Sequence, residues 1–212
     1  MRLVLPKGRL LQGVVDTLKK VDMHFEFVDR NYCPTCSKAH VLAKLLKVRA
    51  IPQLVALQNF DIGFCGLDLV READYEEVVP LVDLGLNKVE IVVAVPENNK
   101  DIVENPPTRP LLIATEYEHM ADRWALTKNL AHITIQTYGS TEGYAPEDAD
   151  IVFDCRETGT TLRANNLIVI EKLMDSSTWL VANKFSLEDK GRRLAIETLA
   201  QELKTVLSTK AI

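Results

Sequence analysis

The sequence has 212 residues, of which 47% are hydrophobic and 26% charged. These values are typical of a globular protein with a sizeable core. Acidic residues outnumber basic ones by 30 to 25, and the net charge of -5 argues against general binding of nucleic acid, which needs a basic surface. No apolar run approaches the roughly 18 residues of a membrane span, and the N-terminus lacks the apolar core of a signal peptide. We therefore expect a cytoplasmic protein with no membrane or nucleic-acid partner.

In the first half of the chain, apolar strands alternate with helical patterns. Leu10, Val14, Leu18 and Val21 recur at helical spacing. The predicted elements are a strand at 2–5, a helix at 10–20, a short helix at 51–60 and a strand at 61–65 that ends in Gly66. This alternation is typical of α/β sheets with crossover helices.

The second half continues this alternation around one proline-rich loop. Predicted strands lie at 89–95, 111–114 and 133–138, a loop at 96–110, and helices at 120–130 and 187–207. Ser186 is expected to be the N-cap of the last helix, with Asp189 at the capping-box position.

The number of these units predicts two small α/β lobes. Long apolar stretches at 89–95 and 168–182 are the expected crossings between them. The first lobe would then comprise residues 1–87 with 182–212, and the second residues 88–181. A central cleft between two lobes is the default place for a ligand.

The segment "DCRETGTTLRANN", residues 154–166, follows the apolar run of residues 151–153. A strand followed by a Gly/Thr-rich turn and a helix start exposes backbone N–H groups and hydroxyls to an anion. Gly159 lets the backbone approach that anion without a Cβ in the way. A threonine that merely caps the helix is the alternative, but one hydroxyl would suffice for a cap. The segment predicts a phosphate site.

Asp154 precedes this turn, at the end of the predicted strand. Carboxylates accept hydrogen bonds from sugar hydroxyls. A carboxylate beside a phosphate site therefore indicates a pentose phosphate, although solvated acids at strand ends are also common in α/β proteins.

Three further strand ends carry polar turns. In "LPKGRL", residues 5–10, Lys7 and Arg9 precede a helix and could bind a second anion, or form a solvated basic turn. Asp68 follows Gly63 and Gly66 in "DIGFCGLDLV", and Glu142 lies in "YGSTEGYAP" after Gly139 and Ser140.

Cys33 and Cys36 form a CxxC pair with His40 close behind. The pair could be half a zinc site or a redox pair, or two incidental thiols. A structural zinc site usually needs four ligands, and the sequence has no second CxxC or HxxxH pair. We expect no zinc.

Taken together, the motifs resemble the catalytic subunit of the ATP phosphoribosyltransferase family. The resemblance rests on "LPKGRL", "KVRAIPQLV" leading into "DIGFCGLDLV", "IATEY", "GSTEGYAP" and "DIVFDCRETGTTLRANNL", in the family's order and spacing. It runs from residue 3 to about residue 183, but "NYCPTCSKAHVLAK" departs from the family pattern at residues 30–44.

The resemblance implies two α/β lobes like those of type II periplasmic binding proteins. It implies transfer of the phosphoribosyl group of phosphoribosyl pyrophosphate (PRPP) to N1 of ATP, the first step of histidine biosynthesis, with substrate-bound Mg²⁺. The length resembles the family's short form, which implies a homodimer that assembles with a regulatory subunit similar to histidyl-tRNA synthetase.

The resemblance also implies roles for individual residues. The 5′-phosphate of PRPP would be bound by Glu157, Thr158, Gly159, Thr160, Thr161 and Leu162, and its ribose by Asp154. Pyrophosphate and ATP would be bound by Lys7, Arg9, Arg30, Arg49 and Asp68. The catalytic candidates are Arg9, Arg49, Glu142 and Asp154.

Two other functions remain alternatives at this point. A non-catalytic solute-binding or ligand-sensing protein could share the fold, but it would lack the TGTTL loop and the basic residues. A salvage phosphoribosyltransferase usually has adjacent acids before its loop, whereas Asp154 and Glu157 are separated.

Overall fold

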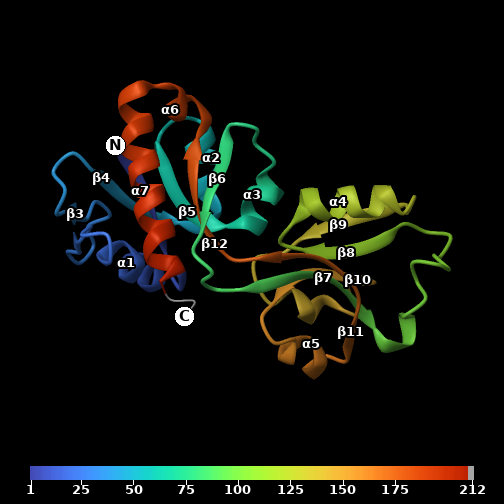
Figure 1. Cartoon of the computed structure of the whole chain (residues 1–212). Helices are drawn as coiled ribbons and strands as arrows, with labels where there is room; N and C mark the ends of the chain where they lie inside the picture. Colours follow the sequence, from blue (N-terminus) through green and yellow to red (C-terminus); the bar gives the residue numbers. More distant parts are fainter. Residues whose placement is uncertain (210–212) are drawn as a thin grey trace. The chain divides into compact units, whose positions relative to one another are not determined.

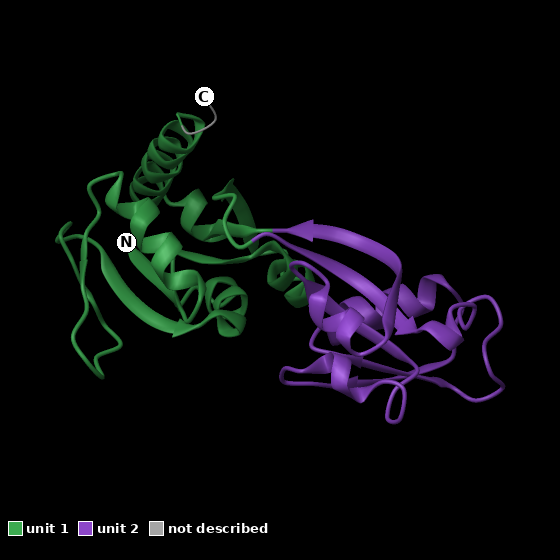
Figure 2. Cartoon of the chain, turned by 90° about the horizontal axis from the view of Figure 1, so that it is seen from below, with its two compact units in different colours: residues 1–87, 177–212 green, residues 88–176 purple. Residues whose placement is uncertain are grey.

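The computed structural model describes residues 1–209 and contains two compact units (Figure 1). Unit 1 consists of Met1–Asn87 and the chain from Ser177 onward, and unit 2 is Lys88–Ser176 (Figure 2). No helix in the described part of the chain is long and apolar enough to cross a membrane.

Unit 1 is built on a five-stranded sheet with the order β4-β1-β5-β12-β6. Strands β1, β4 and β5 are parallel, and β12 runs antiparallel to β5 and β6. The strands are β1 (Arg2–Lys7), β4 (Leu42–Lys47), β5 (Ile62–Gly66), β6 (Val78–Asp83) and β12 (Thr178–Asn183), with a separate hairpin-like pair of β2 (Phe25–Glu26) and β3 (Thr35–Cys36).

Helices cover both faces of this sheet. The helices are α1 (Leu10–Lys19), α2 (Ile51–Ala56), α3 (Leu67–Ala73), α6 (Lys184–Glu188) and α7 (Lys190–Ser208), with a 3₁₀ turn η1 (Val48–Ala50). Leu3 and Leu5 belong to a core shared with residues of α1 and α7. Successive strand side chains point to opposite faces. Val4 accordingly lies on the other face, where a Cβ added to Gly63 would touch both Val4 and Ile51 of α2.

Unit 2 is built on a second five-stranded sheet with the order β11-β7-β10-β8-β9. Strands β8, β9 and β10 are parallel, whereas β7 runs antiparallel to β10 and β11. The elements are β7 (Val89–Pro96), η2 (Glu97–Asn99), β8 (Leu111–Thr115), α4 (Glu118–Thr127), β9 (His132–Gln136), η3 (Thr141–Tyr144), β10 (Ile151–Arg156), α5 (Thr160–Ala164) and β11 (Leu167–Ser176).

The side chains of β10 divide the core of unit 2 between the two faces of the sheet. Val152 packs in a cluster with Leu162 of α5, and Phe153 packs against Trp124 of α4, with ring centroids 6.5 Å apart. By the alternation of strand side chains, Asp154 and Arg156 lie on the Val152 face, which α5 covers. This arrangement decides which side chains of β10 can approach the loop that follows it.

The end of the chain differs from the sequence-based expectation. Two helices replace the single predicted one, and the N-cap of α7 is Asp189, whose side chain accepts a hydrogen bond from the Arg192 amide at 2.9 Å. Ser186 lies inside α6, and its amide donates to the Asn183 side chain at 2.9 Å. The prediction of Ser186 as the cap of the long helix was wrong, because Asn183 and Asp189 each begin a helix here.

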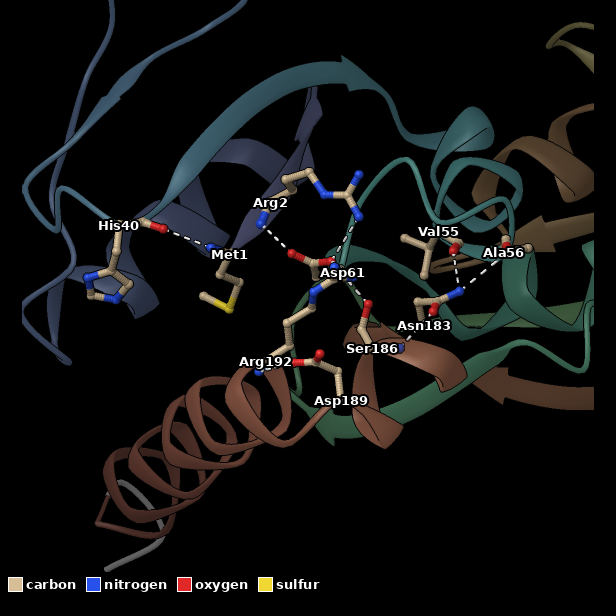
Figure 3. Close-up of polar contacts among 10 residues, drawn as sticks. All are labelled: Met1, Arg2, His40, Val55, Ala56, Asp61, Asn183, Ser186, Asp189 and Arg192. Carbon is tan, nitrogen blue, oxygen red and sulfur yellow. Dashed lines mark hydrogen bonds and ion pairs between the residues drawn. The ribbon is translucent and has the colours of Figure 1, made fainter.

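The Ser186 hydroxyl instead donates to the buried carboxylate of Asp61, at 3.0 Å (Figure 3). Asp61 also accepts from the Arg2 amide at 2.6 Å and from the Arg2 guanidinium at 3.1 Å, and it lies 3.5 Å from Nη1 of Arg192. One carboxylate thus joins the first strand of the chain to its last two helices.

The predicted second crossing, at residues 168–182, consists of two strands rather than one. Strand β11 belongs to unit 2 and β12 to unit 1, and the boundary between the units falls at Ser176–Ser177. The expected boundary at 181/182 therefore lies inside β12. Two adjacent apolar strands are hard to separate by hydrophobicity alone, because nothing stronger than two serines divides them.

Candidate active site

The polar turns of unit 2 follow the carboxyl ends of its parallel strands. Strands β8, β9 and β10 are in register at Thr115, which pairs with Gln136 of β9 and Phe153 of β10. The turn after β9 and the loop after β10 therefore leave the sheet at the same edge. In α/β folds this edge is where ligands bind.

The loop after β10 is anchored by Leu162, which is buried, while Thr158, Thr160 and Thr161 are exposed. Gly159 adopts φ +72°, in the left-handed region that disfavours residues with a Cβ. Helix α5 begins directly after Gly159 and has no side-chain cap. The threonine hydroxyls are thus not used as helix caps. The hydroxyls of Thr158 and Thr160, on either side of Gly159, share a hydrogen bond of 3.0 Å.

Asp154 lies two residues before the end of β10 and is half-buried. One of its carboxylate oxygens accepts a hydrogen bond from the Cys155 amide at 2.7 Å. Because its side chain is on the face covered by α5, the carboxylate lies on the same side of the sheet as the Gly159 loop. The predicted pairing of an acid with the phosphate loop is therefore geometrically feasible.

The turn after β9 is held by a buried contact between two hydroxyls. Thr137 and Thr141 share a hydrogen bond of 2.8 Å, and both are almost completely buried. Gly139 (φ +110°) and Ser140 (φ +52°) adopt left-handed conformations between them. Glu142 follows in η3 and is half-buried. The turn thus has a fixed backbone that presents Glu142 at the edge shared with the Gly159 loop.

Two arginines at the Gly159 loop were not among the predicted site residues. A Cβ added to Gly159 would lie 3.3 Å from Nη1 of Arg163 and 3.5 Å from Nη1 of Arg156. Arg163 follows the loop within α5, and Arg156 ends β10. Their positions within "DCRETGTTLRANN" could have marked both arginines as neighbours of the predicted phosphate site.

In unit 1 the basic candidates also follow parallel strands at one edge. Lys7 ends β1 and pairs in register with Lys47, which ends β4. Arg9 follows Lys7 before α1, and Arg49 follows Lys47 in η1. All of these side chains are exposed. Neither Lys7 nor Arg9 has a carboxylate partner among residues 1–209. The edge therefore carries positive charge that could bind an anion.

Asp68 follows β5 at this edge but is buried, in the first turn of α3. A Cβ on Gly66 would overlap the Asp68 carboxylate, so the glycine is needed for the carboxylate to fold back over the strand end. Burial raises the pKa of the neighbouring Cys65 thiol, and the Asp68 carboxylate adds to the rise. Cys65 is therefore a neutral thiol at physiological pH.

Arg30 lies apart from these residues in the described contacts. It is exposed, has φ +59°, and pairs only with the adjacent Asp29, at 3.8 Å. The following residues carry the CxxC pair, in which Cys33 is exposed and Cys36 buried. Within the described residues, no three His, Cys, Asp or Glu side chains are grouped closely enough to bind a metal ion.

The structure thus divides the candidates between the two units. Unit 1 holds the basic set of Lys7, Arg9 and Arg49, with Asp68. Unit 2 holds Glu142, Asp154 and the loop at 157–162. Each set gathers at one edge of its own sheet, from loops that follow different parallel strands.

Comparison with known proteins identifies relatives of this chain. The ATP phosphoribosyltransferase family model matches residues 47–205. An ATP phosphoribosyltransferase of Prosthecochloris aestuarii is 34% identical over 96% of this chain and 70% of its own length. One from Methanocaldococcus jannaschii is 33% identical over 95% of this chain and 70% of its own length.

Two solved structures also resemble this chain. A chain of the ATP phosphoribosyl transferase (HisG:HisZ) complex from Thermotoga maritima matches with a TM-score of 0.86 and 25% identity, over 99% of both chains. The GluR0 ligand-binding core matches with a TM-score of 0.58 and 11% identity, over 100% of this chain and 93% of its own. The latter likeness concerns the fold alone, which is that of periplasmic-binding-protein-like α/β proteins.

Proposed function

The chain belongs to the ATP phosphoribosyltransferase family, and from this premise we propose roles for each unit taken by itself: unit 2 binds the phosphoribosyl part of PRPP, and the basic residues of unit 1 bind phosphate groups of pyrophosphate or ATP. The reaction is the first step of histidine biosynthesis. The N1 lone pair of ATP's adenine forms a bond to the anomeric carbon of PRPP. The bond from that carbon to the pyrophosphate oxygen breaks, and pyrophosphate leaves with the electron pair.

The Gly159 loop is the main support for the PRPP assignment. Its threonine hydroxyls are exposed and unused by the helix that follows, and its glycine adopts a left-handed conformation that disfavours residues with a Cβ. We assign residues 157–162 to the 5′-phosphate and Asp154 to the ribose hydroxyls. Asp154 is on the same face of the sheet as the loop, so one sugar phosphate could reach both groups.

The charge of the unit 1 edge suits the departing pyrophosphate. Adenine N1 is a poor nucleophile, so catalysis must come mainly from positioning and from stabilising negative charge on the leaving group. Arg9 and Arg49 are our catalytic candidates for this role. Lys7, Arg30 and Asp68 are less direct candidates for pyrophosphate or ATP. Glu142 of unit 2 would orient the substrate.

Magnesium ions fit this scheme as part of the substrates. Mg²⁺ keeps several waters and binds mainly through phosphate oxygens and one or two carboxylates, so it needs no dedicated protein cage. When bound to pyrophosphate, it would neutralise charge on the leaving group. Glu142 and Asp154 are our candidates for a single carboxylate contact from this chain.

The remaining parts of the proposal concern assembly and location. A solved relative is a complex of two kinds of subunit. We propose that this chain likewise forms a homodimer and assembles with a regulatory subunit similar to histidyl-tRNA synthetase. We also propose that each unit is an independent α/β lobe, and that the enzyme acts in the cytoplasm, where a biosynthetic enzyme finds ATP and PRPP.

The PRPP assignment can be tested by changing Gly159→Val. A β-branched residue at φ +72° is strained, which favours a change in the loop backbone, and its Cβ would also press on the guanidinium of Arg163. Calorimetric titration should show PRPP binding at least about tenfold weaker. In a Trp179→Phe background, Trp124 fluorescence reports on unit 2, and its unfolding curve should remain close to that of the same background with Gly159 intact. Unchanged PRPP affinity would rule out the loop assignment.

A further inference from the structure

Arg156 is fixed at the end of β10 by a carboxylate from a neighbouring strand. Its Nε and Nη2 atoms both lie 2.7 Å from one oxygen of Glu90, the residue opposite it in the β7–β10 ladder. The second oxygen of Glu90 accepts from Lys172 at 2.9 Å, and Lys172 also pairs with Asp175 at 2.7 Å. The Arg156 guanidinium is therefore held in a network of four charged side chains from three strands.

This network leaves Nη1 of Arg156 facing the Gly159 loop. A Cβ added to Gly159 would lie 3.5 Å from that nitrogen and 3.3 Å from Nη1 of Arg163. The two cationic groups thus face the same small volume. Arg163 has no carboxylate partner among the described residues, and its guanidinium lies 3.4 Å from the Thr160 hydroxyl.

Two guanidinium groups repel one another unless an anion lies between or beside them. The network itself is neutral, because Arg156 and Lys172 are balanced by Glu90 and Asp175, so Arg163 adds a positive charge at the loop that this network does not balance. Guanidinium groups bind phosphate oxygens with strong, directional hydrogen bonds. A dianionic phosphate at the Gly159 loop would therefore satisfy both arginines.

We infer that Arg156 is a binding residue for the 5′-phosphate of PRPP, and that Glu90 is its positioning residue. The inference rests on the proposed function, because it takes the Gly159 loop as the phosphate site. It adds a charged contact to a loop whose other proposed contacts are backbone amides and hydroxyls. It also assigns a role to Glu90, which lies 66 residues away from Arg156 in the sequence.

The test is binding of ribose 5-phosphate, which carries this phosphate but no pyrophosphate. Arg156→Gln removes the charge and keeps much of the side-chain length. Titration calorimetry should show ribose 5-phosphate binding weakened about 10- to 100-fold, the range expected for a lost hydrogen bond to a charged group. Arg156→Lys should recover part of the affinity, and ATP binding should stay within about twofold of the wild type.

Arg109→Gln is the matched control. Arg109 belongs to the same unit and pairs with Asp150 at 2.7 Å, but this pair lies at the amino end of β8 and β10, at the opposite edge of the sheet. The variant changes the net charge equally and should leave ribose 5-phosphate binding unchanged. Unfolding followed by Trp124 fluorescence in a Trp179→Phe background verifies that both variants keep unit 2 folded.

Glu90→Gln tests the positioning role. It should weaken ribose 5-phosphate binding several-fold in the wild-type background and have no further effect in the Arg156→Gln background, since the two residues act as one unit. Equal losses in both backgrounds would contradict the positioning role. Wild-type affinity in Arg156→Gln, or loss of ATP binding alone, would overturn the assignment of Arg156. A wild type that binds PRPP but not ribose 5-phosphate would overturn this inference alone, whereas a wild type that does not bind PRPP would contradict the proposed function.

Discussion

The ammonium group of Lys7 lies 4.9 Å from the centre of the Tyr32 ring. Lys7 ends β1 at the basic edge of unit 1, and Tyr32 lies in the segment that departs from the family pattern. The backbone of Tyr32 is fixed by a hydrogen bond of 2.7 Å from the Leu45 amide to its carbonyl oxygen. This unusual segment therefore supports a candidate substrate-binding residue, although it lies between β2 and β3 rather than at the strand end itself.

Replacing Tyr32 by leucine should weaken binding of the substrate that we propose Lys7 contacts. A partly exposed cation–π contact contributes about 0.5–1 kcal/mol, which corresponds to a rise of about two- to fivefold in the KM for PRPP or ATP. Tyr32→Phe keeps the ring and should behave as the wild type. The effect should vanish when Lys7 is replaced by alanine. Steady-state kinetics of the four variants measures this, and an equal effect of Tyr32→Leu without Lys7 would contradict a role through Lys7.

The ribose assignment predicts a larger effect for Asp154→Asn. Hydrogen bonds from ribose hydroxyls to a charged carboxylate contribute about 1.5–3 kcal/mol to binding, and the substitution removes that charge. The value of kcat/KM for PRPP should therefore fall about 10- to 100-fold. Asp148→Asn changes the same charge on an exposed side chain of unit 2 and should have little effect. Equal kinetics of the two variants would remove Asp154 from the site.

The Asp61 network predicts how stability depends on pH (Figure 3). Burial of the Asp61 carboxyl opposes ionisation. Hydrogen bonds from the Arg2 amide, the Arg2 guanidinium and the Ser186 hydroxyl outweigh it, so the pKa of Asp61 lies below its ordinary value. The folded protein therefore binds fewer protons than the unfolded chain. The resulting stability is present above about pH 4 and is lost as pH falls through the lowered folded-state pKa.

Asp61→Asn should lower the free energy of unfolding of unit 1 by about 2–4 kcal/mol near neutral pH, because the buried hydrogen bonds lose their charged acceptor. Much of this difference should disappear in acid. Urea unfolding can be followed by Trp179 of β12 in a Trp124→Phe background, since the two tryptophans lie in different units. A pH-independent difference in stability between this variant and the protein with Asp61 intact would contradict the lowered pKa.

Close packing at Gly63 predicts a second stability effect. A Cβ there would lie 2.7 Å from methyl groups of both Ile51 and Val4, in the buried interface between β5 and α2. Gly63→Ala should therefore destabilise unit 1 by about 1–3 kcal/mol. Gly191→Ala, in the first turn of α7 with only an ordinary contact to Asp189, is the matched control and should be neutral or slightly stabilising. Equal Trp179 unfolding curves for both variants would refute the effect of close packing.

Much of this fold could be predicted from local patterns. The strands that became β5, β7 and β8 are short apolar runs, and β9, "HITIQ", alternates polar and apolar residues. Glycines or polar side chains follow near the ends of these strands. Strand β4 could not be recognised in the same way, because "LAKLLK" has the composition of an amphipathic helix. It forms a strand because every residue pairs in register with β1. Tertiary pairing overrides local propensity here.

In the candidate site too, some residues could be predicted from local sequence and others depend on distant strand pairing. The Gly159 loop, Asp154 and Lys7 could be predicted as candidates because each lies within a few residues of the end of a strand. The role of Arg156 could not be predicted, because it depends on Glu90, which only the antiparallel pairing of β7 with β10 brings opposite it. Contacts set by distant strand pairing leave no local pattern in the sequence.

Formation of phosphoribosyl-ATP from ATP, PRPP and Mg²⁺ tests the central claim most directly. Substitution at N1 alters the adenine chromophore, so the product is followed by ultraviolet absorbance and matched against the pyrophosphate released. We expect an absorbance change that requires both substrates, with one pyrophosphate for each product molecule. Absence of product, both for this chain alone and with a regulatory subunit similar to histidyl-tRNA synthetase, would contradict the proposed function.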